Sequence, residues 1–174
     1  MVDKAVIIAA YHADKWITEC VLSVVRIAQE DWRFIIIDNG GNSGLRDAPA
    51  LVESRVEILR RTGPLPFSEA NNFALINGGM ASEYVCFLNQ DTISREDWLS
   101  ACLAVMERDH RVGTVIPLIE NYHGTAWDDA FVTCCRASRE LYARVQQGVR
   151  ATFDDFPDFL EVPEITAAAM VVRT

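Results

Sequence analysis

Two side chains able to bind a cation stand close together in the run FLNQDT, residues 87–92. An apolar segment of strand length, residues 84–88, ends there, and Asn89 and Asp91 follow with one residue between them. Ligands of open parallel α/β sheets lie outside the carboxyl ends of the strands, so both side chains are expected to face a crevice. Magnesium and manganese prefer oxygen ligands, often one or two carboxylates with water and substrate phosphate. The pattern predicts a divalent-cation site.

A structural role is the alternative for the same residues. Asn89 could close a turn, and Asp91 or Ser94 could start the helix that contains Trp98, because Asn, Asp and Ser are favoured in turns and at helix starts. The motif by itself leaves both interpretations open.

Two earlier predicted strands also end in candidate ligand residues. Tyr11 and His12 follow the first strand, and Asp38 followed by Asn-Gly-Gly ends the second. A carboxylate there can accept hydrogen bonds from a nucleobase imide or a ribose hydroxyl, although the same residues suit a plain turn. The GxGxxG fingerprint and the GxxxxGK[ST] loop are missing, which disfavours a nicotinamide cofactor and a P-loop.

An alternation of strand and helix patterns would bring these strand ends to one edge of a sheet. Apolar runs typical of strands covered on both faces occupy residues 5–10, 34–38, 56–59, 84–88 and 112–116. Helical spacing covers residues 16–27, with Asp14 as cap, residues 67–80, opened by Ser68, and residues 98–106. This order predicts an α/β fold with a mainly parallel sheet flanked by helices.

The last third of the chain has weaker patterns. They predict a loop over 121–130, a helix over 137–147 ended by Gly148, an irregular connector over 153–164 and an apolar run over 165–172. No repeat or linker divides the 174 residues, which suit a single domain.

Composition narrows the class of protein. No apolar run approaches the roughly 20 residues of a membrane span, and the start lacks a signal-peptide pattern. Five cysteines without a CxxC pair fit buried thiols in a reducing cytoplasm and disfavour zinc. The net charge of −9 argues against nucleic-acid and anionic-membrane partners. Hydrolase motifs such as HExxH and GxSxG are missing.

Taken together, the motifs resemble those of glycosyltransferase family 2, inverting enzymes with a GT-A (Rossmann-like) fold. The resemblance covers residues 6–119 and rests on AVIIAAYH, FIIIDNGG, PFSEANNFAL, EYVCFLNQDTISREDWL and VGTVIPLI. It implies that Ala10, Tyr11 and Asp38 hold the nucleoside. Asn89-Gln90-Asp91 corresponds to the family's DxD motif, which implies that Asp91 coordinates a Mn or Mg ion and that Asn89 lies at the nucleotide.

Further details point to one branch of the family. LNxDT resembles rhamnosyltransferases and other polysaccharide-biosynthesis enzymes, and Asn72 stands at the family's recurrent Asn near the nucleotide. Asn71 stands where relatives often have Arg; for both, a polar helix face is an equal alternative. The chain is about two residues longer than the family pattern between 74 and 84, which we expect to enlarge a surface turn. ITAAAMVVRT resembles the strand before the acceptor region, with Ala167 and Ala168 at the donor sugar.

The resemblance implies transfer of a sugar, with inversion, from a UDP- or dTDP-linked donor to a glycan or lipid-linked glycan. The metal would neutralise the leaving diphosphate, and a carboxylate would take the acceptor's proton. The family places that base beyond the end of this chain, so none is assigned. We expect the donor-binding portion of a longer enzyme, with residues 1–119 as the nucleotide-sugar half and 120–174 as the start of the acceptor-side half. Solvated loop positions are expected for the local carboxylates Asp128, Asp129, Asp154, Asp155, Asp158, Glu161 and Glu164.

Two other classes stay open. A nucleotidyltransferase should have a Gly-rich basic loop after the first strand, where AAYHADK offers only Lys15. A non-catalytic nucleotide-binding or interaction module would explain both the missing base and the metal motif in which an amide, Asn89, replaces one carboxylate. Metal-dependent nucleotide affinity would argue against a purely structural role.

Overall fold

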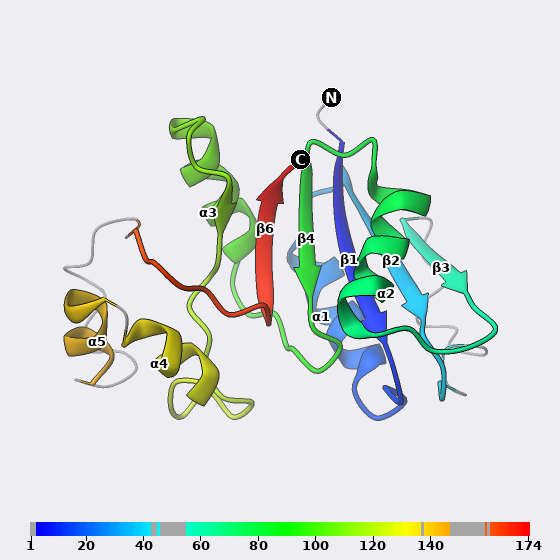
Figure 1. Ribbon diagram of the computed structural model, residues 1–174, viewed down its shortest axis with the longest axis horizontal. Helices are drawn as coiled ribbons and strands as arrows, with labels where there is room; N and C mark the ends of the chain where they lie inside the picture. Colours follow the sequence, from blue (N-terminus) through cyan, green and yellow to red (C-terminus); the bar gives the residue numbers. More distant parts are fainter. Residues whose placement is uncertain (1–2, 43–44, 46–54, 137, 147–158, 160) are drawn as a thin grey trace.

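The computed structural model describes residues 3–42, 45, 55–136, 138–146, 159 and 161–174. In this part of the chain, six strands form one sheet in the order β3-β2-β1-β4-β6-β5 (Figure 1). Parallel pairing joins β3 (Val56–Arg60), β2 (Trp32–Asp38), β1 (Lys4–Ala10) and β4 (Tyr84–Leu88). β6 (Ala169–Arg173) runs antiparallel to β4 and to β5 (Thr114–Val115). The mainly parallel α/β architecture is confirmed.

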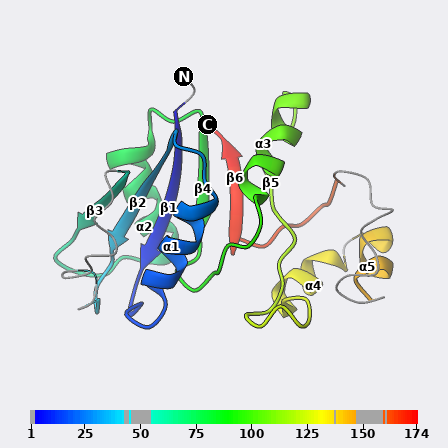
Figure 2. The ribbon, with the colours of Figure 1, turned by 180° about the vertical axis from the view of Figure 1, so that it is seen from behind.

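The residues of β1 alternate between two layers of core. Val6 and Ile8 belong to the cluster formed with α1 (Ile17–Ile27) and α3 (Trp98–Arg108), whereas Ala5 and Ile7 pack with α2 (Phe67–Ala74). Figures 1 and 2 show α2 over one face of the sheet and α1 over the other. Because successive strand side chains point to opposite faces, a strand covered on both sides is a continuous apolar run.

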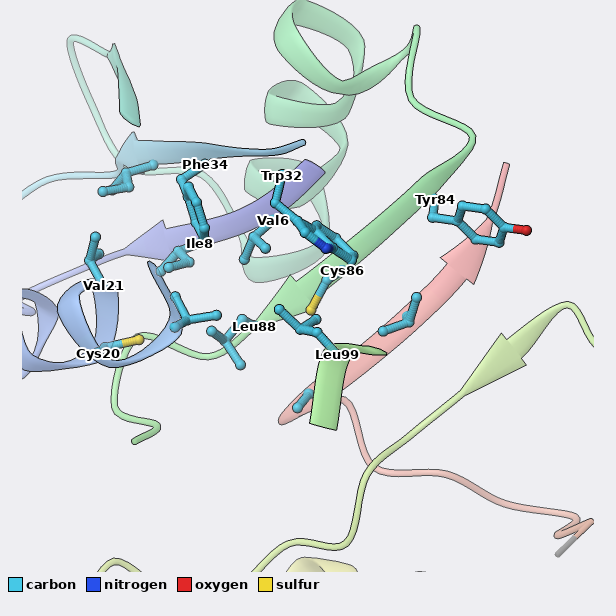
Figure 3. Close-up of a cluster of buried hydrophobic side chains, with 14 of the residues drawn as sticks. Val6, Ile8, Cys20, Val21, Trp32, Phe34, Tyr84, Cys86, Leu88 and Leu99 are labelled. Atoms are coloured by element: carbon cyan, nitrogen blue, oxygen red, sulfur yellow. The ribbon is translucent and has the colours of Figure 1, made fainter. Parts of the chain in front are cut away.

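The larger core lies between the sheet, α1 and α3. Trp32, Phe34 and Leu99 are fully buried there, and Figure 3 shows them around Val6 and Cys86. Burying an apolar side chain of this size stabilises the fold by roughly 1.5–3 kcal/mol. This packing fixes the strands whose carboxyl ends carry the candidate ligand residues.

Two helix starts differ from the sequence prediction. The N-cap of α1 is Trp16, which makes no side-chain cap hydrogen bond, so the prediction of Asp14 as cap is wrong. α3 begins at Trp98 and is capped by Asp97, whose carboxylate accepts a hydrogen bond from the backbone N–H of Ser100. Asp91 therefore does not start this helix, and neither does Ser94.

The helix predicted over 67–80 is also corrected. It begins after Pro66 and not at Ser68, and it is α-helical only as far as Ala74. Leu75–Gly79 form a π-helix, η2. A Cβ added to Gly78 would lie 2.9 Å from Cδ1 of Ile35, so the widened helix packs closely against the sheet at this position. The structure thus accommodates this stretch in a wider helix, whereas the sequence predicts a larger surface turn.

The last third departs most from prediction. β5 spans two residues instead of 112–116, and it is antiparallel to its neighbour because β6 lies between it and β4. The loop predicted over 121–130 ends at Asp128, which caps α4 (Asp129–Cys135), a helix absent from the prediction.

The later elements agree better with the sequence. α5 (Arg139–Val145) falls within the predicted helix, and β6 occupies the second half of the predicted apolar run and extends one residue past it, to Arg173. Residues 137, 147, 148, 153–158 and 160 lie outside the described residues, and with them the ends of the predicted helix and much of the predicted connector. α4 and α5 share a small core beside the sheet, formed by Phe131, Cys135, Leu141 and Val145 (Figure 1). No helix within the described ranges has both the length and the apolar character to span a bilayer.

Candidate functional site

A cavity of about 580 Å³ opens where β1 and β4 end, beside the start of α2. Its size is within the roughly 300–1,000 Å³ common for small-molecule sites. Four segments that are distant in sequence line it, with the residues Ala9, Tyr11, Asn39, Pro64, Leu65, Pro66, Phe67, Asn89, Gln90 and Asp91. The structure therefore places Tyr11, Asn89 and Asp91 around one cavity.

Gln90 connects the two strand ends that carry these residues. Its side-chain Oε1 accepts a hydrogen bond from the backbone N–H of Tyr11 at 2.6 Å, and its Nε2 donates to the carbonyl of Tyr11 at 3.0 Å. Both atoms of the amide are thus bonded to one residue of the opposite segment. These bonds fix the separation between the end of β1 and the turn that follows β4.

That turn is also held from the sheet and from α1. The backbone N–H of Asn89 donates to Ala168 at 2.9 Å, and its carbonyl accepts from the Thr92 hydroxyl at 2.9 Å and from the Cys20 thiol at 3.4 Å. Burial raises the pKa of Cys20 to about 11, so the thiol keeps its proton at neutral pH and remains a donor. Asn89 therefore closes the turn through its backbone and also lines the cavity.

Asn39 fixes the opposite wall. This buried amide donates from Nδ2 to the carbonyl of Leu65 at 2.9 Å and accepts from the N–H of Leu65 at 2.8 Å. The paired bonds hold residues 64–67, which form the wall beside α2, against the end of β2. From the sequence alone Asn39 is expected only as part of a turn, because its partner lies 26 residues away.

Asp38 stabilises the turn after β2 and is not among the described residues that line the cavity. Its Oδ1 accepts hydrogen bonds from Nδ2 of Asn42 at 2.9 Å and from the N–H of Gly40 at 3.3 Å. Asn42, which is buried, also donates to the carbonyl of Ala10 at 2.7 Å and accepts from the N–H of Ala13 at 2.7 Å. This network joins the ends of β1 and β2.

The same turn needs glycine at one position. Gly41 has φ +73°, and a Cβ there would overlap the imidazole of His12. The backbone N–H of His12 donates to the carbonyl of Gly40 at 3.1 Å. His12 therefore covers the glycine turn and is a structural neighbour of the cavity residue Tyr11, whose ring lies 4.4 Å away.

Other predicted residues lie outside the cavity wall as described. Ala10 is fully buried in the sheet. Asn72 is exposed on α2, while the neighbouring Asn71 is buried and donates to the carbonyl of Phe67. Ala167 is exposed and Ala168 half-buried before β6.

The local carboxylates for which solvated loop positions are expected have different environments. Asp128 is occupied in capping α4, and Asp129, Glu161 and Glu164 are exposed. Asp154, Asp155 and Asp158 lie outside the described residues.

Asp91 is the only charged residue among the ten that line the cavity. The described part of the chain has no cluster of three or more His, Cys, Asp or Glu side chains suited to a metal. A divalent ion at Asp91 would therefore need water or substrate oxygens for most of its shell. Magnesium and manganese commonly bind in this way, so the donor set fits such an ion.

Residues 5–155 match the model of the family described as Glycosyl transferase family 2. The chain belongs to this family. Among curated proteins, it is 24% identical over 112 residues to an uncharacterized glycosyltransferase of Haemophilus influenzae, covering 62% of this chain and 34% of the relative. It is 25% identical over 123 residues to the glycosyltransferase GlyG of Streptococcus pneumoniae, covering 68% and 38%. The chain thus spans little more than a third of the length of these curated relatives.

Two solved structures share the fold of this family member. The mannosyltransferase PcManGT from Pyrobaculum calidifontis, in complex with GDP-Man and Mn²⁺, matches with a TM-score of 0.64 at 15% identity, covering 98% of this chain and 44% of that one. S. aureus TarS in complex with UDP-GlcNAc matches with a TM-score of 0.61 at 16% identity, covering 75% and 38%. At this identity the likeness shows the GT-A-like fold alone.

Proposed function

We propose that this chain is the donor-binding portion of a metal-dependent, inverting glycosyltransferase that uses a UDP- or dTDP-linked sugar. The acceptor is a glycan or lipid-linked glycan, and the enzyme acts in the cytoplasm within the rhamnosyltransferase-like, polysaccharide-biosynthesis branch. Residues 1–119 form the nucleotide-sugar half, and residues 120–174 begin the acceptor-side half and contribute β6.

The observation that carries this proposal is a cavity with one carboxylate and no cationic lining residue, in a chain of this family. A diphosphate carries several negative charges, and Asp91 would repel it. Asp91 would hold a divalent ion, and the positive charge of that ion would offset the repulsion. Neighbours whose structures contain GDP-Man with Mn²⁺ or UDP-GlcNAc support the choice of ligand class.

The residues around the cavity have separate roles in this proposal. Tyr11, whose side chain is 47% exposed, offers an aromatic face to the base, and Asp38 and Asn72 complete the nucleoside site from the adjoining turn and helix. Ala10 shapes the end of β1. Asn89 and Asp91 face the diphosphate, and Asp91 holds the cation.

The chemistry is a single displacement. The acceptor hydroxyl attacks the anomeric carbon while the bond to the nucleoside diphosphate breaks, so the configuration inverts and no covalent enzyme intermediate forms. When bound, the cation stabilises the negative charge that develops on the leaving diphosphate. A carboxylate base takes the hydroxyl proton as the acceptor attacks, and no residue is assigned to this role.

The test is thermal unfolding with UDP, dTDP and GDP, each with and without Mn²⁺. At a ligand concentration of 100 times Kd, binding adds about 2.7 kcal/mol, which raises the midpoint by about 5–10 °C for a chain of this size. We expect this rise with UDP or dTDP only when Mn²⁺ is present, and its loss in Asp91→Asn. Glu107→Gln removes the same charge from an exposed site on α3 and should keep the full rise.

A stabilisation that is independent of Mn²⁺ and of Asp91 would contradict the proposed site. The alternative of a non-catalytic nucleotide-binding module predicts the same stabilisation, and an assay of sugar transfer to an acceptor distinguishes the two. A nucleotidyltransferase is disfavoured because the segment after β1, AAYHADK, lacks the Gly-rich basic loop that would grip a triphosphate.

A further inference from the structure

Gln90 stands between the two candidate ligands of the NQD motif, yet its described bonds go to neither. Its amide oxygen and nitrogen both bond to the backbone of Tyr11, 79 residues earlier in the chain. The contact at 2.6 Å from the Tyr11 N–H is among the shorter hydrogen bonds of the structure. A side chain that uses both atoms of its amide on one distant residue is a connector between two segments.

The two segments carry different parts of the cavity. Tyr11 supplies an aromatic side chain, and its ring packs edge-on against His12 with 4.4 Å between ring centroids. Asp91 supplies the carboxylate from the other segment. Sheet pairing does not join the two segments near Tyr11 and Gln90, because the described β1–β4 register ends at Ile7 and Phe87.

We infer that Gln90 is a positioning residue that couples the nucleoside wall at Tyr11 to the cation residue Asp91. This inference rests on the proposed function. A nucleoside diphosphate held by both walls needs them at a fixed separation, and hydrogen bonds already made in the free protein supply that separation before binding. A ligand that contacts only one wall gains little affinity from this fixed separation.

The consequence is a measurable link between metal and nucleotide affinity. We define the metal enhancement as the Kd for UDP without Mn²⁺ divided by the Kd with Mn²⁺. Gln90→Met keeps the length of the side chain and removes both bonds. It should lower the metal enhancement about tenfold, or about 1.4 kcal/mol, which is the net value of one to two hydrogen bonds. The Kd for UDP without Mn²⁺ should change less than about twofold.

The matched control is Gln29→Met, which removes an exposed glutamine amide that donates to the Ser100 hydroxyl at 3.2 Å. This variant should keep the wild-type metal enhancement. Gln90→Asn keeps the amide but is one methylene shorter, and it should behave like Gln90→Met; it also serves if the methionine variant does not fold. Because the readout is a ratio within one variant, a general loss of stability cancels.

Titration calorimetry of the 174-residue chain, below the unfolding range of every variant, gives the four constants for each comparison. A metal enhancement that stays at the wild-type value in both Gln90 variants would overturn the inference. An equal loss of affinity with and without Mn²⁺ would also overturn it, because that result means direct contact between Gln90 and the nucleotide. If the wild type shows no metal enhancement at all, the proposed function itself fails.

Discussion

Replacing Asn39 by alanine should destabilise the fold well beyond the effect of an ordinary asparagine substitution. Asn39 is 4% exposed, and its amide makes two hydrogen bonds to the backbone of Leu65. Each bond contributes about 1 kcal/mol net, and a buried backbone group left without its partner costs about 1–3 kcal/mol. Leu65 is half-buried, so water can replace part of the loss. We expect a decrease of about 2–3 kcal/mol in the free energy of unfolding.

Urea unfolding measures this decrease. With a denaturant dependence of about 2 kcal/mol per M, the midpoint should fall by about 1–1.5 M, and the thermal midpoint by about 4–12 °C. The matched control is Asn77→Ala, which removes an exposed amide bonded to the carbonyl of Phe73 in its own helix, and it should stay within about 0.5 kcal/mol of the wild type. Equal midpoints for the two variants would refute the assignment of Asn39 as the residue that holds the cavity wall.

Two further substitutions test the turn after β2 and the contact between α1 and the turn after β4. Gly41→Ala should lower the free energy of unfolding by at least about 1–2 kcal/mol, because Gly41 has φ +73° and a Cβ there overlaps His12. The control Gly63→Ala adds a Cβ in open space and should be neutral or slightly stabilising in the same urea titration. Similar free energies for the two variants would contradict the predicted strain at Gly41. Burial raises the pKa of Cys20 from 9.0 to about 11, so unfolding releases a proton between these pH values and the stability from the neutral thiol is lost as pH rises. The free energy of unfolding of Cys20→Ala should therefore fall less steeply with pH over that window, and its slope should differ from that of the wild type by about 1.4 kcal/mol per pH unit. Parallel curves for the two proteins would show that burial does not raise the pKa of this thiol.

The strands and the motif at the end of β4 are predictable because their causes are local. A buried parallel strand must be apolar on both faces, so a continuous apolar run such as AVIIAA predicts one. Polar residues then mark where each strand leaves the sheet. Asn89 and Asp91 are therefore expected at a sheet edge from sequence alone, and both line the cavity.

The supporting contacts are not predictable in this way, since their causes lie elsewhere in the chain. Nothing near Gln90 indicates that its amide bonds to Tyr11, and nothing near Asn39 points to Leu65. The direction of β5 depends on a strand that pairs with it from more than 50 residues later. The end of α2 also differs, because residues 75–79 form a π-helix, whereas helical spacing alone predicts an uninterrupted α-helix.

The place of β6 in the sheet has a consequence for the newly made protein. β4 ends at Leu88 and its antiparallel partner begins at Ala169, so at about 5–20 residues per second the ribosome needs roughly 4–16 s to add the chain between them. During that interval the flank of β4 that will pair with β6 is an open strand edge, a site where other chains can pair. During the same interval the N–H of Asn89 lacks its acceptor, the carbonyl of Ala168. The turn that carries Asp91 is thus completed only after Ala168 has been synthesised, and until then an emerging chain has both an open strand edge and an unfinished cavity wall.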